Sequence, residues 1–163
     1  MIADTLRFAR EESTEREAIL VDLGSLIDSL VEDMRATAAP VTITPGPRAV
    51  VRGDAGELRR AIANLIGNAI RYGGGAAVTW AVADDSVAVT VCDEGPGIDM
   101  TGAERLFEPF VRGDPSRNRA TGGSGLGLAI VRSIATRHGG HATLANRTDR
   151  RGAVATIILP LVG

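Results

Sequence analysis

Three short motifs follow one another in a fixed order along the chain, and this order constrains the fold more than any other feature of the sequence. A helical pattern with two asparagines spans residues 64–72, an acidic Gly-Pro-Gly turn spans 93–97, and a glycine-rich loop before another helical pattern spans 122–127. Each motif alone occurs as a turn or a cap in many unrelated folds. Together they predict one ATP site, built from a helix, a strand end and a loop.

The composition indicates one globular domain and excludes several classes of partner. The 163 residues are 44% hydrophobic and 23% charged, which is enough to form a packed core. A net charge of -2 provides no basic field for nucleic acid or an anionic membrane. No apolar run approaches the roughly 20 residues that span a bilayer, and Cys92 has no disulfide partner. We therefore expect a cytoplasmic domain that contacts neither nucleic acid nor membrane.

Hydrophobic periodicity predicts helices that alternate with strands. Two amphipathic helices are expected to begin after the N-caps Asp22 and Asp54, and a third occupies residues 125–138. The helix after Asp54 is expected to run to Tyr72, because three glycines follow it. Four segments with alternating apolar residues are expected to form the main sheet, namely 78–82, 87–92, 141–145 and 154–159.

The remaining segments are predicted from their turn residues and charges. Residues 41–44 and 49–52 flank a Pro-Gly-Pro turn and are expected to pair as a small hairpin. Residues 1–17 are expected to be helical, with a thin apolar stripe followed by charges. Residues 97–125 are rich in Gly, Pro, Arg and Asn, and we interpret this stretch as a lid.

Polar side chains gather on one flank of the central helix. A turn of about 100° per residue brings Asn64, Asn68, Arg71 and Tyr72 together beside the apolar face. An asparagine oxygen can ligate Mg²⁺ beside phosphate oxygens, arginine can bind those oxygens, and tyrosine can lie along a base. On an isolated helix the same residues would be a solvated stripe. The two glycine-rich motifs that follow favour the binding role.

Asp93 and the glycine-rich loop supply the other two parts of the predicted site. Asp93 ends an apolar strand, so its carboxylate can accept a hydrogen bond from an adenine amino group, although Asp there is also a common turn former. The loop precedes a helix, whose first N–H groups favour phosphate. It lacks the Lys-Ser/Thr of a P-loop, and no βαβ unit surrounds it. Arg112, Arg117 and Arg119 reach phosphate when the lid closes, or belong to a solvated basic loop.

With these motifs in view, residues 20–162 resemble the catalytic ATP-binding domain of bacterial sensor histidine kinases, in the GHKL superfamily shared with DNA gyrase and the MutL repair proteins. The N box is similar to residues 58–72, the first glycine box to 93–97, the F box to 106–110 and the second glycine box to 123–128. The resemblance implies the Bergerat fold, an α/β two-layer sandwich with a mixed sheet packed on three helices and a long ATP lid. It also implies ATP and Mg²⁺ as cofactors.

The resemblance assigns roles that agree with those inferred from the residues. It implies that Asn68 ligates Mg²⁺, that Asp93 binds the adenine amino group, that Tyr72 lies near the base and that the glycines line the phosphates. The full set of predicted nucleotide-binding residues is Asn64, Asn68, Arg71, Tyr72, Asp93, Gly95, Gly97, Ile98, Phe107, Arg112, Arg117, Gly123, Ser124, Gly125, Leu126 and Gly127.

Two differences from the related families narrow the expected activity. Hydrolytic relatives have a glutamate where this chain has Asn64, and an amide cannot serve as a general base, so we expect little intrinsic ATPase activity. The sequence contains no His-Glu-Leu-Arg-like acceptor box, and His138 and His141 are expected to be structural. Residues 1–17 resemble only the end of a dimerisation helix plus a linker, and residues 18–163 resemble the catalytic domain.

The resemblance therefore implies a protein-histidine kinase domain that is not competent alone. Its expected partners are a histidine-bearing dimerisation domain of the same kinase and a response regulator, at the cytosolic end of a membrane-bound sensor. The run 109–114 is similar to the EnvZ osmosensor type, which implies OmpR-like regulators. Two alternatives remain, a nucleotide-binding regulatory module without transfer and a serine kinase or ATPase of the same superfamily. A serine kinase of that kind would need a glutamate in place of Asn64.

Overall fold

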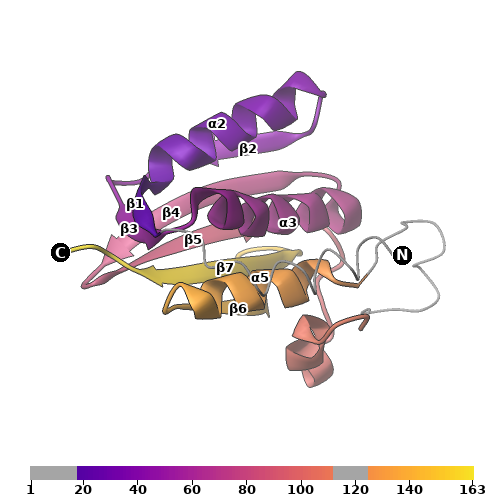
Figure 1. Ribbon diagram of the computed structural model, residues 1–163. Helices are drawn as coiled ribbons and strands as arrows, with labels where there is room; N and C mark the ends of the chain where they lie inside the picture. Colours follow the sequence, from indigo (N-terminus) through magenta and orange to yellow (C-terminus); the bar gives the residue numbers. More distant parts are fainter. Residues whose placement is uncertain (1–17, 112–124) are drawn as a thin grey trace.

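The computed structural model describes residues 18–111 and 125–163, which form a sheet covered on one face by helices (Figure 1). The elements in chain order are β1 (Ile19–Asp22), α2 (Leu23–Ala36), β2 (Val41–Thr44), β3 (Val50–Gly53), α3 (Ala55–Gly73), β4 (Ala76–Ala83), β5 (Ser86–Cys92), the 3-10 helix η1 (Met100–Phe107), α5 (Gly127–Arg137), β6 (His141–Asn146) and β7 (Ala153–Pro160). The predicted α/β sandwich with three helices on a mixed sheet is confirmed. The helix predicted over residues 1–17 lies outside the described residues.

The main sheet has five strands in the order β2-β4-β5-β7-β6. Strands β2 and β4 run parallel, and the other neighbours are antiparallel. The four predicted strands are confirmed, and β2 is the fifth. The core lies between the sheet and the helices, where residues such as Val78, Val89 and Ile157 pack against Ile62 and Ile66 of α3 with 2% exposure or less.

The predicted hairpin between residues 41–44 and 49–52 is wrong. Strand β2 joins the main sheet beside β4, while β3 pairs with β1, a strand that the sequence patterns did not predict. The intervening turn packs on Trp80 of β4 instead of closing a hairpin. A Cβ on Gly46 would lie 2.0 Å from the carbonyl oxygen of Trp80, and the indole N–H of Trp80 donates to the carbonyl of Pro47 over 2.7 Å.

The contact between Trp80 and Pro47 gives a first testable prediction. The Trp80→Phe variant should lose about 1 to 2 kcal/mol of unfolding free energy, because the Pro47 carbonyl loses its buried donor. Urea unfolding followed by circular dichroism measures this loss. Tryptophan fluorescence would not serve, because Trp80 is the only tryptophan and the variant lacks it. Thr44→Ala, at an exposed position of β2 opposite Thr79, is the control and should unfold at nearly the wild-type urea concentration. An unchanged midpoint for Trp80→Phe would contradict the anchoring role.

Short-range caps fix the ends of the helices as predicted. The Asp22 carboxylate accepts from the N–H of Ser25 over 3.1 Å at the start of α2. The Asp54 carboxylate accepts from the N–H of Glu57 over 2.9 Å at the start of α3. Helix α3 ends at Gly74, whose φ of 77° is a left-handed conformation that glycine adopts without strain.

His138 connects the end of α5 to the start of α3. Its Nδ1 lies 2.7 Å from the carbonyl oxygen of Ile134, and its Nε2 accepts from the N–H of Asp54 over 3.1 Å. Gly53 leaves space for the ring, because a Cβ there would lie 2.2 Å from the imidazole Cδ2. His138 therefore has the structural role that the sequence predicted, while His141 is exposed at the start of β6.

The outer face of the main sheet carries a row of threonines. The strand registers place one threonine of each strand beside the next, in the order Thr44, Thr79, Thr90, Thr156 and Thr143. The hydroxyls of Thr90 and Thr156 lie 3.4 Å apart. Threonine suits this position, because its branched side chain favours a strand and its hydroxyl tolerates water. No helix within the described part of the chain is long and apolar enough to cross a membrane.

Candidate functional site

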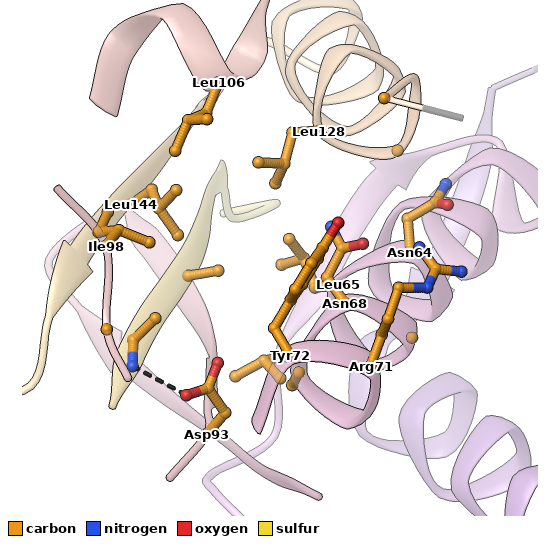
Figure 2. A pocket seen from close by; sticks show the side chains of 18 of the residues that line it. Asn64, Leu65, Asn68, Arg71, Tyr72, Asp93, Ile98, Leu106, Leu128 and Leu144 are labelled. Atoms are coloured by element: carbon orange, nitrogen blue, oxygen red, sulfur yellow. Dashed lines mark hydrogen bonds between the residues drawn. The ribbon is translucent and has the colours of Figure 1, made fainter. Parts of the chain in front are cut away.

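A cavity of about 630 Å³ opens between α3, the loop after β5, η1 and the start of α5 (Figure 2). This volume lies in the range of small-molecule sites. The cavity brings together polar residues from three distant parts of the sequence, as the motifs predicted. Nine of the predicted site residues line it, namely Asn64, Asn68, Arg71, Tyr72, Asp93, Gly97, Ile98, Gly125 and Gly127.

Three predicted site residues lie behind the cavity wall instead of in it. Phe107 and Leu126 are each 3% exposed and belong to the packed interior. Gly95 lies against the end of α3, where a Cβ would approach the carbonyl oxygen of Tyr72 to 2.6 Å, and its N–H donates to Asp93. These residues shape the wall without facing the space. The predictions for Arg112, Arg117, Gly123 and Ser124 lie outside the described residues.

The apolar part of the wall was not predicted. Side chains from α3, η1, α5 and β6 form it beside Ile98, namely Leu65, Leu106, Leu128 and Leu144, and Arg105 of η1 adds a charge. The leucines follow the same helical and strand periodicity as core residues. Periodicity shows that such residues are turned inward, but it does not distinguish a packed interior from the wall of a cavity.

The amides of Asn64 and Asn68 face the first turn of α5. A Cβ on Gly127 would lie 3.5 Å from Asn64 Oδ1 and 3.6 Å from Asn68 Nδ2. Glycine therefore leaves the start of α5 open toward the two amides. The N-cap residue of α5, Leu126, has an apolar side chain that makes no capping hydrogen bond. A helix N-terminus favours an anion, so the start of α5 and the two amides make this end of the cavity suited to a phosphate group.

The carboxylate of Asp93 is oriented by the backbone. Its Oδ1 accepts from the N–H of Gly95 over 2.9 Å and from the N–H of Ala153 over 3.0 Å. The residue is 9% exposed, and in Figure 2 its second oxygen points into the cavity. Gly73 permits the close approach of α3, because a Cβ there would lie 2.4 Å from the Asp93 Cβ. Asp93 therefore offers the cavity one fixed acceptor oxygen.

Two groups near the cavity, Cys92 and Asp99, have shifted pKa values. Burial raises the pKa of the Cys92 thiol, which stays protonated at neutral pH. Cys92 is half-buried on the face of β5 that carries Thr90, outside the packed core. The N–H of Thr101 donates to Asp99 and lowers the pKa of that carboxyl, which caps the start of η1.

The first part of the predicted lid is a helix and not a loop. Residues 100–107 form η1, whose Phe107 ring lies under the Arg132 guanidinium of α5 with 4.4 Å to the ring centroid. Arg132 also pairs with Glu104 of η1. The N–H of Phe110 donates to the carbonyl of Gly125 over 3.0 Å. The apolar cluster of the F box therefore fixes this segment on α5, and residues 112–124 of the predicted lid lie outside the described part.

Comparisons with known proteins agree with this geometry. The profile of the family described as histidine kinase-, DNA gyrase B-, and HSP90-like ATPase matches residues 53–163. The chain is 36% identical over 169 residues to the sensor-like histidine kinase SenX3 of Mycolicibacterium smegmatis, which covers 98% of the chain and 44% of that protein. It is 37% identical over 168 residues to the sensor histidine kinase CusS of Escherichia coli O6:H1, with 98% and 35% covered. The chain thus spans less than half the length of these relatives.

Solved structures give the same likeness. The ATP binding domain of PrrB from Mycobacterium tuberculosis matches with a TM-score of 0.74 and 26% identity, covering 91% of the chain and all of that domain. The histidine kinase domain of the E. coli osmosensor EnvZ matches with a TM-score of 0.69 and 31% identity, covering 93% of each chain.

Proposed function

Because the chain belongs to the family of histidine kinase-, DNA gyrase B- and HSP90-like ATPases, as the ATP-binding catalytic domain of a sensor histidine kinase, we propose that its cavity binds Mg-ATP and presents the γ-phosphate to a histidine outside these 163 residues. The observation that carries the proposal is the convergence of Asp93, Asn68 and Gly127 on one cavity. A fixed acceptor lies at one end and a helix N-terminus beside two amides at the other. An adenine amino group needs a hydrogen-bond acceptor, and a triphosphate needs hydrogen-bond donors and a favourable helix dipole.

In this proposal the base lies at the Asp93 end of the cavity. The free carboxylate oxygen accepts from the adenine amino group, and Ile98 and Leu144 provide apolar contact for the ring. Tyr72 is 46% exposed, so it covers the base from the solvent side. Arg71, on the same flank of α3, binds phosphate oxygens by charge-assisted hydrogen bonds.

The donor groups at the other end fit Mg²⁺. Asn68 supplies a neutral oxygen, which hard cations accept beside phosphate oxygens and water. Within residues 18–111 and 125–163 no cluster of three His, Cys, Asp or Glu could hold a metal by itself. In this proposal Asn68 and the nucleotide would hold the ion together, and the bound ion would offset the charge of the phosphates.

The proposed reaction is a direct transfer of the γ-phosphoryl group to histidine. The imidazole nitrogen forms a bond to the γ-phosphorus, the bond to the bridging oxygen breaks, and ADP leaves with that electron pair. The domain contributes by positioning, since Asn64 has no basic group with which to activate water. We extend the proposal to a dimerisation domain that carries the histidine, an OmpR-like response regulator that receives the phosphoryl group, and a location at the cytosolic end of a membrane-bound sensor.

A reconstitution experiment tests the transfer. The chain is mixed with a separately produced histidine-bearing hairpin of the same kinase and with ATP labelled in the γ-phosphate. We expect label on the hairpin, and none when its histidine is replaced by glutamine. ATP binding is measured in parallel by calorimetry. An unlabelled hairpin in spite of measured ATP binding would defeat the kinase proposal and favour a regulatory module that binds nucleotide without transfer.

A further inference from the structure

The turn between β6 and β7 (residues 147–152), with Asn146 before it, contacts the loop that follows β5. The Asn146 side chain pairs with the backbone of Ile98 in both directions. Its Oδ1 accepts from the N–H of Ile98 over 2.7 Å, and its Nδ2 donates to the carbonyl of Ile98 over 2.9 Å. This pairing fixes Ile98 as a neighbouring strand would, because both backbone groups of one residue are bound by one rigid amide.

Glycines allow this contact to be close. Gly97 has a φ of 78°, and a Cβ there would lie 2.6 Å from Asn146 Oδ1. On the other side, a Cβ on Gly152 would lie 2.0 Å from the carbonyl oxygen of Asp93. Any side chain at either position would separate the turn from the loop.

Arg147 supplies a second attachment. Its side chain is 13% exposed, and one guanidinium nitrogen donates to the carbonyl of Asp93 over 3.3 Å. The other two nitrogens bind Asp149 over 2.9 and 2.8 Å. Hydrogen bonds from Arg147 and then Arg150 hold the pKa of Asp149 well below its usual range. Because this pKa is lowered, the pair persists at neutral pH and is lost only on strong acidification.

We propose that Asn146 and Arg147 are positioning residues for the base of the nucleotide, an inference that rests on the function proposed above. Ile98 and Asp93 line the cavity, while Asn146 and Arg147 do not. The turn therefore binds the backbone atoms of the two residues that meet the base, and it does so from behind the cavity wall. It fixes where the Asp93 carboxylate and the Ile98 side chain stand before the ligand arrives, which is preorganisation.

The phosphate end of the site is independent of this turn. Asn68 and Gly127 belong to α3 and α5, whereas the side-chain hydrogen bonds that Asn146 and Arg147 make outside their own turn go to the loop after β5. Loss of the attachment should therefore weaken recognition of the base and spare recognition of the phosphates. A purely structural role would lower both together.

Calorimetry of the full chain with Mg-ATP and with magnesium tripolyphosphate tests this difference. Asn146→Ala should lower the affinity for ATP about tenfold, because the loop must be ordered on binding. Its affinity for tripolyphosphate should stay within about twofold of wild type. The amide hydrogen of Ile98, protected by Asn146 in the free protein, should exchange faster in the variant. Thr143→Ala, on the same strand but on the threonine row, is the matched control and should behave as wild type.

Arg147→Lys gives a second and independent test, because it keeps the charge and loses the planar fork. It should lower ATP affinity in the same selective manner, while a variant with wild-type ATP affinity would show that only charge matters and would contradict positioning by Arg147. Equal losses for ATP and tripolyphosphate, or unchanged ATP affinity in Asn146→Ala, would overturn the inference. A wild-type chain that does not bind ATP would instead overturn the proposed function, and the inference with it.

Discussion

Replacing Asp93 with asparagine should lower the affinity for ATP about 100-fold and leave the unfolding free energy nearly unchanged. The amide oxygen of the variant still accepts from the N–H groups of Gly95 and Ala153, which the carboxylate Oδ1 binds in the wild type. The amide nitrogen then occupies the place of the oxygen that points into the cavity. A donor would face the adenine amino group, which is also a donor. Calorimetry with Mg-ATP and urea unfolding measure the two effects.

Asp93→Ala is the informative companion of this variant. It removes the acceptor as well as the charge, so both backbone N–H groups lose their partner, at about 1 to 3 kcal/mol for each group left unsatisfied. Its unfolding free energy should therefore fall where that of Asp93→Asn does not. Comparing the two variants separates the contribution of Asp93 to the unfolding free energy from its contribution to ATP affinity. Wild-type ATP affinity in Asp93→Asn would rule out contact with the base.

The Asn68→Ala variant should lose the increase in ATP affinity that Mg²⁺ provides. Removing a ligand of the ion should cost at least as much as removing an outer partner of a ligand, about 10- to 100-fold. Titrations with ATP in the presence of Mg²⁺ and of EDTA give this increase directly for each protein. In EDTA the variant and the wild type should bind ATP with similar affinity, because Asp93 and the apolar wall are intact.

Asn64→Ala is the matched control, since Asn64 lies one turn earlier on the same flank of α3 and also faces Gly127. If Asn68 is the metal ligand, Asn64→Ala keeps the Mg²⁺-dependent increase. An increase that survives in Asn68→Ala and disappears in Asn64→Ala would transfer the metal role to the other asparagine. If Mg²⁺ still increases the ATP affinity of both variants, neither asparagine is the metal ligand.

The parts of the fold that depend on neighbours in the sequence could be predicted. Asp54 and Gly74 mark the ends of α3 by hydrogen bonds and by a left-handed backbone conformation, both of which are local. Four of the five strands of the main sheet were predicted from the periodicity of their apolar residues. The partners of β2 and β3, which are β4 and β1, could not be predicted. The turn between the two strands packs on Trp80, which lies 33 positions beyond Pro47.

The residues of the candidate site also fall into those that the sequence could predict and those that it could not. The polar residues of the cavity stand in recognisable motifs. Helix spacing predicted Asn64 and Asn68, and the glycine turn after an apolar strand predicted Asp93. The leucines of the wall share their periodicity with the core and could not be singled out. Asn146 was missed for another reason, since an asparagine at the end of a strand resembles a turn former, and its partner Ile98 lies 48 positions earlier.

Strand β7 has a consequence for the order in which the domain is made. It lies between β5 and β6, and its first residue, Ala153, donates one of the two hydrogen bonds that orient the Asp93 carboxylate. Synthesis proceeds from the N-terminus, and pairings between distant segments form late. A nascent chain that ends before residue 153 already contains the polar side chains that line the cavity. It lacks β7, whose backbone helps to orient the Asp93 carboxylate. The second backbone donor to the Asp93 carboxylate therefore becomes available only after β7 has been synthesised.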